Sequence, residues 1–414
     1  MATKSKQNKT IVLPIEEENY PFFLSDPKYA HETIMDFMNQ APELFPSDML
    51  EKGYSLYGKD RKSKKLGVQL RRLKVGTEIY RIRPGFVLPY MRAKTKDVEH
   101  ALLLVRFGVP FWVLALIFGR NPMYWYRLYT SLADFNIVAT TVYGPGKVPR
   151  DILADEFHVR IKGAKAYVAT VIAKACFLGA EVCAKADELS LRKAYGVFKA
   201  EVTEFVSDYQ PFTINVDGWA ATQNALKFLF PKTRIIECFL HAFIKIRDRA
   251  TKKLSHYYAK TADGVWNIFR AETKAQMAQR IRRFKEWAIR TLPACAMKEN
   301  VLKLCSKKDK WLAHFDAPSA YRTSAQLDRV MKVMEKHAVN SQMFHAGISS
   351  TSKNFRALAL LCNFSPSCPA VTKDCPSLVS PAARLNGFVY SENWLENLLT
   401  ASSLKRFKHQ RNSL

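Results

Sequence analysis

The order of strand-like and helix-like segments between residues 152 and 249 most constrains how this chain folds. Runs rich in β-branched and aromatic residues predict strands, and apolar residues at helical spacing predict helices. Three strands come first, at 152–161, 166–173 and 176–183, and an amphipathic helix then extends to Phe205. A strand ending at Asp217, a short helix at 220–229, a strand at 233–239 and a basic helix from His241 follow. This order predicts an α/β domain whose mixed sheet is flanked by helices.

Two aspartates occupy informative positions in these strands. Asp155 lies inside the first strand, and Asp217 ends the fourth strand, directly before Gly218. The segment order is that of a ribonuclease H-like domain, in which the first and fourth strands lie side by side at the centre of the sheet. We therefore expect Asp155 and Asp217 to be neighbours in space.

A third aspartate, Asp328, lies on a predicted helix in which Leu327, Met331 and Met334 fall at helical spacing. Two strand aspartates and one helix aspartate favour a shared site for two Mg²⁺ or Mn²⁺ ions, which prefer oxygen ligands. Such an ion pair stabilises both the attacking and the leaving oxygen of a phosphoryl transfer. The alternative is that three unrelated aspartates stand out among 37 acidic residues.

The chain is strongly basic. Its 414 residues include 64 Lys and Arg against 37 Asp and Glu, which gives a net charge of +27. Such an excess indicates a polyanionic partner, because each neutralised phosphate releases counterions. We expect double-stranded DNA, although a ribosomal-type or membrane-surface protein has a similar charge. The length predicts two or three domains.

The cysteines and the apolar segments predict a protein of a reduced, intracellular environment. The eight cysteines form no CxxC pair, and Cys362, Cys368 and Cys375 lack the paired spacing of a zinc site. Residues 1–10 are polar and Lys-rich, unlike a secretory signal. The apolar run at 107–119 is too short to cross a bilayer, so we expect no membrane contact and interpret the run as a buried helix.

Three short helices are predicted between residues 95 and 132, joined by tight turns at Gly108 and Gly119. This pattern is typical of a helix-turn-helix DNA-binding region. The last helix would present Tyr124, Arg127 and Ser131 to the major groove. The alternative is a helical hairpin that belongs to a core.

Upstream, residues 68–75 and 78–83 flank Gly76-Thr77 and predict a β-hairpin. Its cations either contact phosphates or form a solvated face; they are Arg71, Arg72, Lys74, Arg81 and Arg83.

Five short motifs occur in a fixed order along the chain. They are Ala154-Asp-Glu-Phe-His158, the run from Val216 to Ala225, Leu229-Phe-Pro231, Cys238-Phe-Leu-His241, and the run from Arg322 to Asp328. In this order they resemble DDE/D transposases of the bacterial insertion-sequence type and, more distantly, Mutator-like enzymes. The resemblance covers roughly residues 95–365.

The resemblance implies a ribonuclease H-like catalytic core, a helix-turn-helix for transposon ends and a helical insertion that shields DNA. It also implies a place in the bacterial cytoplasm or nucleoid. It also implies that Asp155, Asp217 and Asp328 bind the metal ions and catalyse the reaction. The third acidic residue of such enzymes is frequently Glu, so Glu335 and Asp316 are alternatives to Asp328.

Other residues near these motifs have expected roles. Cys238 and His241 are too few ligands for zinc, so we expect them to pack near Asp217 and support it. Glu156 points to the opposite face of the strand from Asp155. Trp219 either stacks on a base or fills the core beneath the catalytic edge, and we expect the core. Lys245, Arg247 and Arg249 on the following helix either bind DNA phosphates or form a solvated face.

The predicted organisation has five parts. They are an N-terminal basic region with the hairpin (1–93), the helix-turn-helix (94–143), the catalytic domain (144–255 and 318–365), the helical insertion (256–317) and a C-terminal basic tail (366–414). The predicted function is a DNA transposase that hydrolyses phosphodiesters and transfers strands, acting as a homodimer or larger homo-oligomer. Alternatives are a catalytically inactive, transposase-derived DNA-binding protein and a basic protein associated with RNA or ribosomes.

Overall fold

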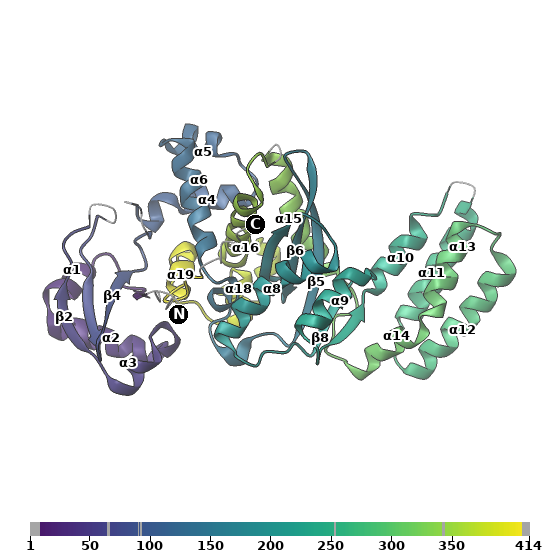
Figure 1. The fold of residues 1–414 in the computed structure, drawn as a ribbon, viewed down its shortest axis with the longest axis horizontal. Helices are drawn as coiled ribbons and strands as arrows, with labels where there is room; N and C mark the ends of the chain where they lie inside the picture. Colours follow the sequence, from purple (N-terminus) through teal and green to yellow (C-terminus); the bar gives the residue numbers. More distant parts are fainter. Residues whose placement is uncertain are drawn as a thin grey trace.

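The computed structural model describes residues 9–63, 67–89, 91, 93–251, 254–341 and 344–407. The chain forms three parts in a row, which are a small sheet with helices, a central sheet with helices, and a helical arm (Figure 1). The basic lead predicted at 1–10 lies almost wholly outside the described residues.

The central sheet has five strands, β5 (Asp151–Ile161), β6 (Ala164–Ala173), β7 (Cys176–Cys183), β8 (Thr213–Val216) and β9 (Arg234–Glu237). Their spatial order is β7-β6-β5-β8-β9. The pairs β5–β6 and β6–β7 are antiparallel, whereas β8 is parallel to both β5 and β9. The predicted mixed sheet is confirmed, and so is the pairing of its first and fourth strands.

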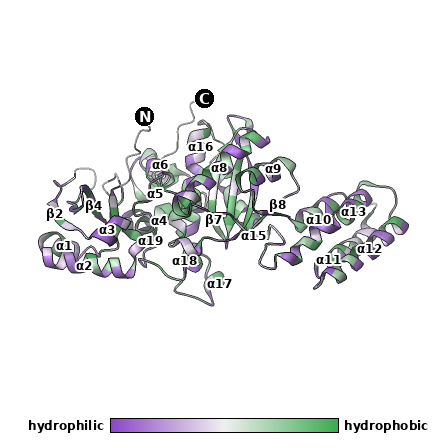
Figure 2. Cartoon of the chain, turned by 60° about the horizontal axis from the view of Figure 1, so that its bottom comes forward, coloured by the Kyte–Doolittle hydropathy of each residue, from purple (hydrophilic) through white to green (hydrophobic). Residues whose placement is uncertain are grey.

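Helices cover both faces of this sheet. Successive side chains of a strand point to opposite faces, and Ile152 and Ala154 pack in one core cluster with α8 (Glu188–Phe205) and α9 (Ala220–Leu229). Leu153 packs in the other cluster, with α15 (Ala325–Asn340) and α16 (Ile348–Phe364). Figure 2 shows the apolar character of the central strands between these helices.

The N-terminal sheet has the order β1-β4-β3-β2, with β1 (Thr10–Leu13), β2 (Ser55–Lys59), β3 (Arg71–Val75) and β4 (Glu78–Pro84). Three helices accompany it, α1 (Tyr20–Ser25), α2 (Pro27–Gln40) and α3 (Ser47–Lys52). The predicted hairpin is therefore confirmed as β3–β4.

The cations of this hairpin do not form one solvated or phosphate-binding face, which corrects the sequence interpretation. Arg71 and Arg83 are buried and donate to backbone carbonyls, Arg71 to Phe23 and Leu24 and Arg83 to Val87. Sequence cannot distinguish these two from exposed arginines, because their partners lie on other elements and loops.

The three helices predicted between 95 and 132 are present as α4 (Thr95–Arg106), α5 (Phe111–Phe118) and α6 (Pro122–Ser131). A short helix, α7 (Ile137–Thr141), follows. The buried residues of α4 and α6 belong to the same core cluster as α16 and the sheet. The interpretation of 107–119 as a buried helix is wrong, because α5 buries only Leu114.

Residues 366–407 do not form a tail, which corrects another prediction. They include α17 (Pro369–Thr372), α18 (Pro381–Asn386) and α19 (Trp394–Ala401), and the last two are largely buried. The segment after α19 reaches the N-terminal sheet, where Val12 N donates to Ser403 Oγ at 3.0 Å.

The arm is helical throughout its main elements. It comprises α10 (Phe239–Arg247), α11 (Ser255–Phe269), α12 (Lys274–Thr291), α13 (Ala296–Ser306) and α14 (Lys308–Leu312). Its apolar residues form a separate core cluster, which includes Phe239 and Ile246. None of the helices in the described ranges has the length and apolar character that a membrane crossing requires.

Candidate functional site

Asp155 lies on β5, and Asp217 directly follows β8, the parallel strand beside it. The last registered pair of β5 and β8 is Leu153 with Asn215, and Asp155 and Asp217 each lie two residues beyond this pair. Asp155 shares its face with Leu153, so it points toward α15. Asp217 follows the last residue of β8 and is half-buried.

The carboxyl group of Asp155 is unusually placed for an acid. Only 18% of its side chain is exposed. Its pKa is raised to about 6, mainly by burial and to a smaller extent by the negative charges of Asp217 and Asp328, against the opposing effects of His241 and of the hydrogen bond from the Glu156 N–H. Three acids that are distant in sequence therefore act on one another across the end of the sheet.

Asp217 is held by the turn that leads into α9. Its Oδ1 accepts a hydrogen bond of 2.7 Å from the backbone N–H of Trp219, and its carbonyl accepts one from Gln223 Nε2 at 3.2 Å. An acidic group before a helix N-terminus interacts favourably with the helix dipole. The turn thus fixes Asp217 at the sheet edge.

Asp328 reaches the site from the first turn of α15. Its Oδ2 accepts a hydrogen bond of 3.2 Å from Ser324 Oγ. Ser324 is in turn bound to Cys238, because its N–H donates to the Cys238 sulfur at 3.1 Å and its hydroxyl accepts from the thiol at 3.3 Å. Cys238 thus connects the end of β9 to the start of α15.

His241 lies between this thiol and Asp155. The contact with Cys238 and, to a smaller extent, the negative charges of Asp155 and Asp217 together raise the pKa of His241 to about 9, against the opposing effect of burial. His241 Nε2 is 3.9 Å from Asp155 Oδ2. Burial alone would raise the pKa of Cys238, but His241 and Ser324 lower it below its usual value. A protonated imidazole therefore partly offsets the acidic charge.

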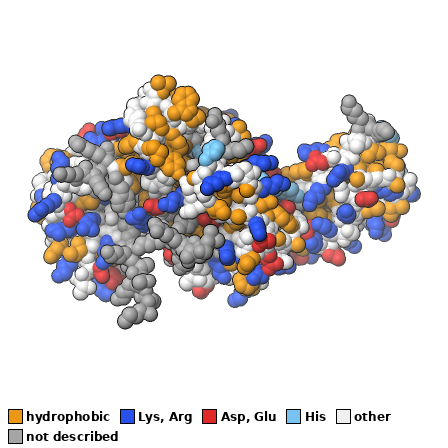
Figure 3. Space-filling model, turned by 45° about the horizontal axis from the view of Figure 1, so that its top comes forward, with side chains coloured by type: hydrophobic (Ala, Val, Ile, Leu, Met, Phe, Trp, Pro, Cys, Tyr) orange, Lys and Arg blue, Asp and Glu red, His pale blue; other side chains and the backbone are white. Residues whose placement is uncertain are grey.

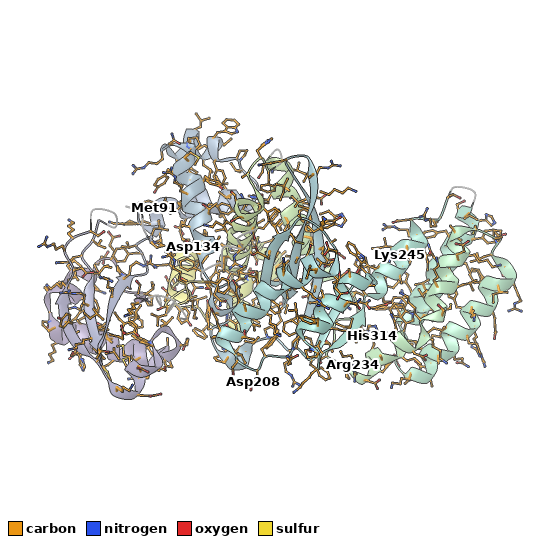
Figure 4. The ribbon with its side chains drawn as sticks, viewed as in Figure 1. Met91, Asp134, Asp208, Arg234, Lys245 and His314 are labelled. Carbon is orange, nitrogen blue, oxygen red and sulfur yellow. The ribbon has the colours of Figure 1, made fainter. Side chains whose placement is uncertain are left out.

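Two lysines flank Asp217. A Cβ atom on Gly218 would lie 3.5 Å from Lys307 Nζ and 3.9 Å from Lys245 Nζ, so both ammonium groups approach this turn. Lys307 also pairs with the buried Glu237 at 2.6 Å. Figure 4 labels Lys245 on α10, where the arm leaves the sheet.

The other two predicted phosphate contacts of this region are exposed on and after α10. Arg247 pairs with its neighbour Asp248 at 2.9 Å, and Arg249 follows the helix. Of these three predicted cations, Lys245 is the one whose ammonium group approaches Gly218, the residue after Asp217.

Glu156 points away from Asp155, toward α8 and α9. It accepts hydrogen bonds from Tyr195 at 2.7 Å and from Thr222 at 2.9 Å. Burial raises its pKa to about 7. Glu156 therefore belongs to the opposite core, as expected from the strand period.

Trp219 is not in the core, which corrects the prediction. Its side chain is 37% exposed, and its ring contacts the edge of Tyr167 at a centroid distance of 6.3 Å. Trp219 precedes the first turn of α9 with an extended backbone, so it does not share the helix face that packs inward.

The two alternative acids are placed differently from Asp328. Asp316 pairs with Lys274 at 2.5 Å, and this hydrogen bond lowers its pKa. Glu335 is exposed two turns further along α15. The acidic charge that reaches Asp155 from α15 is that of Asp328.

The predicted DNA-contacting residues of α6 lie apart from the carboxylates. Tyr124 is half-buried, and the Arg120 guanidinium lies 5.6 Å from its ring centroid. Arg127 is exposed, whereas the Ser131 hydroxyl donates to the Leu128 carbonyl at 2.7 Å. In Figures 1 and 2, α6 and α9 lie in different regions of the molecule.

The carboxylates offer the hard oxygen ligands that Mg²⁺ or Mn²⁺ requires. Their mutual repulsion in a buried setting also favours a cation between them. As the side chains stand, however, no group of three or more His, Cys, Asp or Glu in the described ranges is arranged to hold a metal ion. The carboxylate oxygens are therefore suitable ligands for Mg²⁺ or Mn²⁺, and binding of such an ion has to draw the carboxylates closer together.

Sequence analysis missed several residues of this site. Ser324 lies inside a quoted motif, but only the fold shows that it joins Asp328 to Cys238. No sequence pattern indicated that Lys307 and Glu237 belong to the site, because their ion pair forms only where the arm returns to the sheet.

Comparison with protein-family models and with curated proteins finds no match for this chain.

Proposed function

We propose that this chain cleaves and joins DNA strands as a metal-dependent transposase of the DDE/D type. Asp155, Asp217 and Asp328 would be its catalytic and metal-binding residues, on a ribonuclease H-like sheet. One observation carries the proposal. Asp155 lies on β5, Asp217 directly follows the neighbouring parallel strand β8, and the negative charges of Asp217 and Asp328 both act on Asp155.

The strand order β7-β6-β5-β8-β9 supports the same conclusion, because it places β8 directly beside β5, where it pairs in parallel with Asp151–Leu153. The carboxylates lie near the end of β8. The arm begins close to them, because the next strand, β9, leads directly into α10. A basic chain with net charge +27 suits a phosphate backbone as the substrate.

The residues of the site would divide the work of phosphoryl transfer. Asp155, Asp217 and Asp328 would hold two divalent ions, which would supply stabilisation of the attacking and leaving oxygens. Lys245 and Lys307 hold the neighbouring phosphates beside Gly218. Protonated His241 keeps the buried Asp155 from carrying an uncompensated charge. Positioning and charge stabilisation account for most of the catalysis in such reactions.

The test is strand cleavage of a plasmid that carries this reading frame with its flanking DNA, in Mg²⁺ or Mn²⁺. We expect Asp155→Ala, Asp217→Ala and Asp328→Ala each to lower the cleavage rate by at least about 100-fold, because each removes a ligand. Glu335→Ala and Asp316→Ala are matched controls that keep the wild-type rate.

DNA binding is measured in parallel by gel shift, and all five variants should bind as the wild type does. Cleavage that persists in one of the three site variants removes that residue from the site. A wild-type chain that binds duplex DNA yet cleaves none with either metal refutes the proposal in favour of an inactive DNA-binding protein.

A further inference from the structure

Helix α5 exposes an uncharged apolar surface that nothing in the described chain covers. Leu116 is 76% exposed, Trp112 64% and Ile117 59%, and Phe107, Phe118 and Met123 are exposed beside them. We call these six residues the α5 patch. Figure 3 shows hydrophobic side chains gathered on the projection that Figure 1 labels α5 and α6.

The composition of α5 makes this exposure unusual. The helix sequence is Phe-Trp-Val-Leu-Ala-Leu-Ile-Phe, so it is apolar on every side. Helices of this kind are normally buried on every side. Only Leu114 is fully buried here, while α5 rests on α6 along one side. The remaining sides therefore suit contact with another apolar surface.

The charge around α5 indicates which kind of surface these exposed sides contact. The chain carries a net charge of +27, so two copies repel each other over most surfaces. Residues 107–119 contain no charged side chain. The cations at either end turn toward their own chain, where Arg106 donates to the carbonyl of Pro366 at 2.5 Å and Arg120 lies over Tyr124. Neither is directed to the phosphates of a nucleic acid or a lipid.

We propose that the α5 patch is the contact surface of a homodimer in which α5 of one copy packs against α5 of the other about a twofold axis. Such an axis places the same patch on both sides, which suits an uncharged and self-complementary surface. The inference does not depend on the proposed DNA cleavage.

The size of the patch is sufficient for a dimer. Six large side chains of this exposure contribute roughly 100 Å² each, or about 1,200 Å² for two copies, which is the lower end of a standard interface. An open groove of about 450 Å³ adjoins it, lined by Phe107, Gly108, Val109, Pro110, Val339 and Asn340. The groove extends the apolar surface toward the end of α15.

The experiment is sedimentation equilibrium of the full chain over a concentration series in about 1 M salt, where charge interactions and bound nucleic acid are screened out. We expect wild-type dimers, and we expect Leu116→Glu to weaken dimerisation at least about 10-fold because it places a charge at the interface. Leu189→Glu is the matched control, since Leu189 is an exposed helical leucine outside the patch, 63% exposed on α8.

Circular dichroism tests that both variants fold, which is expected because the substituted side chains are exposed. A wild-type monomer at every concentration overturns the inference, and so does a dimer that Leu116→Glu leaves intact. Vesicles of phosphatidylglycerol and phosphatidylcholine provide a further test. A monomeric wild type whose vesicle binding is lost in Leu116→Glu would assign the patch to a lipid surface and refute the homodimer.

Discussion

Replacing Asp155 by Asn should stabilise the fold while it removes cleavage activity. The ionised carboxylate of Asp155 is buried and faces two other acids, which is why its pKa rises from 3.8 to about 6 in the folded chain. An acid with a raised folded pKa destabilises the fold once it ionises. Asn is uncharged and its amide oxygen can still accept the hydrogen bond of 2.8 Å from the Glu156 N–H.

The magnitude follows from the pKa difference. One pKa unit corresponds to about 1.4 kcal/mol, so the penalty is at most about 3 kcal/mol in the free energy of unfolding above pH 6. The folded state binds the extra proton between pH 3.8 and about 6, so the penalty is absent below this window and grows through it. At pH 5 it should be roughly half of its full size.

The assay is urea unfolding of wild type and Asp155→Asn at pH 5 and pH 7.5 with EDTA present. We expect the variant to be more stable by about 1–3 kcal/mol at pH 7.5 and by less at pH 5. Glu335→Gln, which changes an exposed carboxylate on α15, should change stability by no more than about 0.5 kcal/mol. An Asp155→Asn variant less stable than wild type at pH 7.5 would refute this reasoning.

Two further predictions concern buried polar groups. Cys238→Ala should lower the pKa of His241 from about 9 toward 6.5. NMR titration of the His241 imidazole measures this pKa, and the His241→Asn variant identifies the signal because it removes it. An unchanged pKa would show that the Cys238 thiol does not raise the pKa of His241. The stability from His241 is present below pH 6.5 and is lost as pH rises through 9, so this loss should also shrink in Cys238→Ala. Arg356→Ala should cost about 3–5 kcal/mol in urea unfolding, because it leaves the buried Glu201 unpaired. Lys353→Ala on the same helix, an exposed cation 3.7 Å from Asp134, should cost less than about 1 kcal/mol, and equal costs would contradict this assignment.

The central sheet could be predicted because its information is local. Runs such as 166–173 and 176–183 have strand composition over their whole length, and they are joined by short turns. The adjacency of Asp155 and Asp217 then followed from the segment order. The predicted helix at 220–229 agrees with α9, because its apolar residues recur at helical spacing.

Other features depend on partners that are distant in sequence. Hydrophobicity alone predicted that residues 107–119 are buried, but α5 is exposed, since burial depends on whether another element covers the helix. The predictions for Trp219 and Arg71 are wrong for the same reason, in opposite directions. Trp219 was expected in the core and is exposed, whereas Arg71 was expected on an exposed face and is buried. Composition gives the affinity of a side chain for a core but not its access to one.

The placement of the third acid shows how a distant segment becomes part of a local site. The chain leaves the sheet at Cys238, forms the arm, and returns at Ser324. Because Ser324 N–H binds the Cys238 sulfur, the two ends of the arm meet at one contact. Asp328 follows one turn later and is bound to Ser324, so its position depends on this contact and not on the length of the arm. The same thiol raises the pKa of His241 beside Asp155. We infer that Cys238 has two roles: it positions Asp328, and it controls the charge of His241 near Asp155. Cys238→Ala should therefore alter both the position of Asp328 and the charge of His241, even though Cys238 is not one of the proposed ligands.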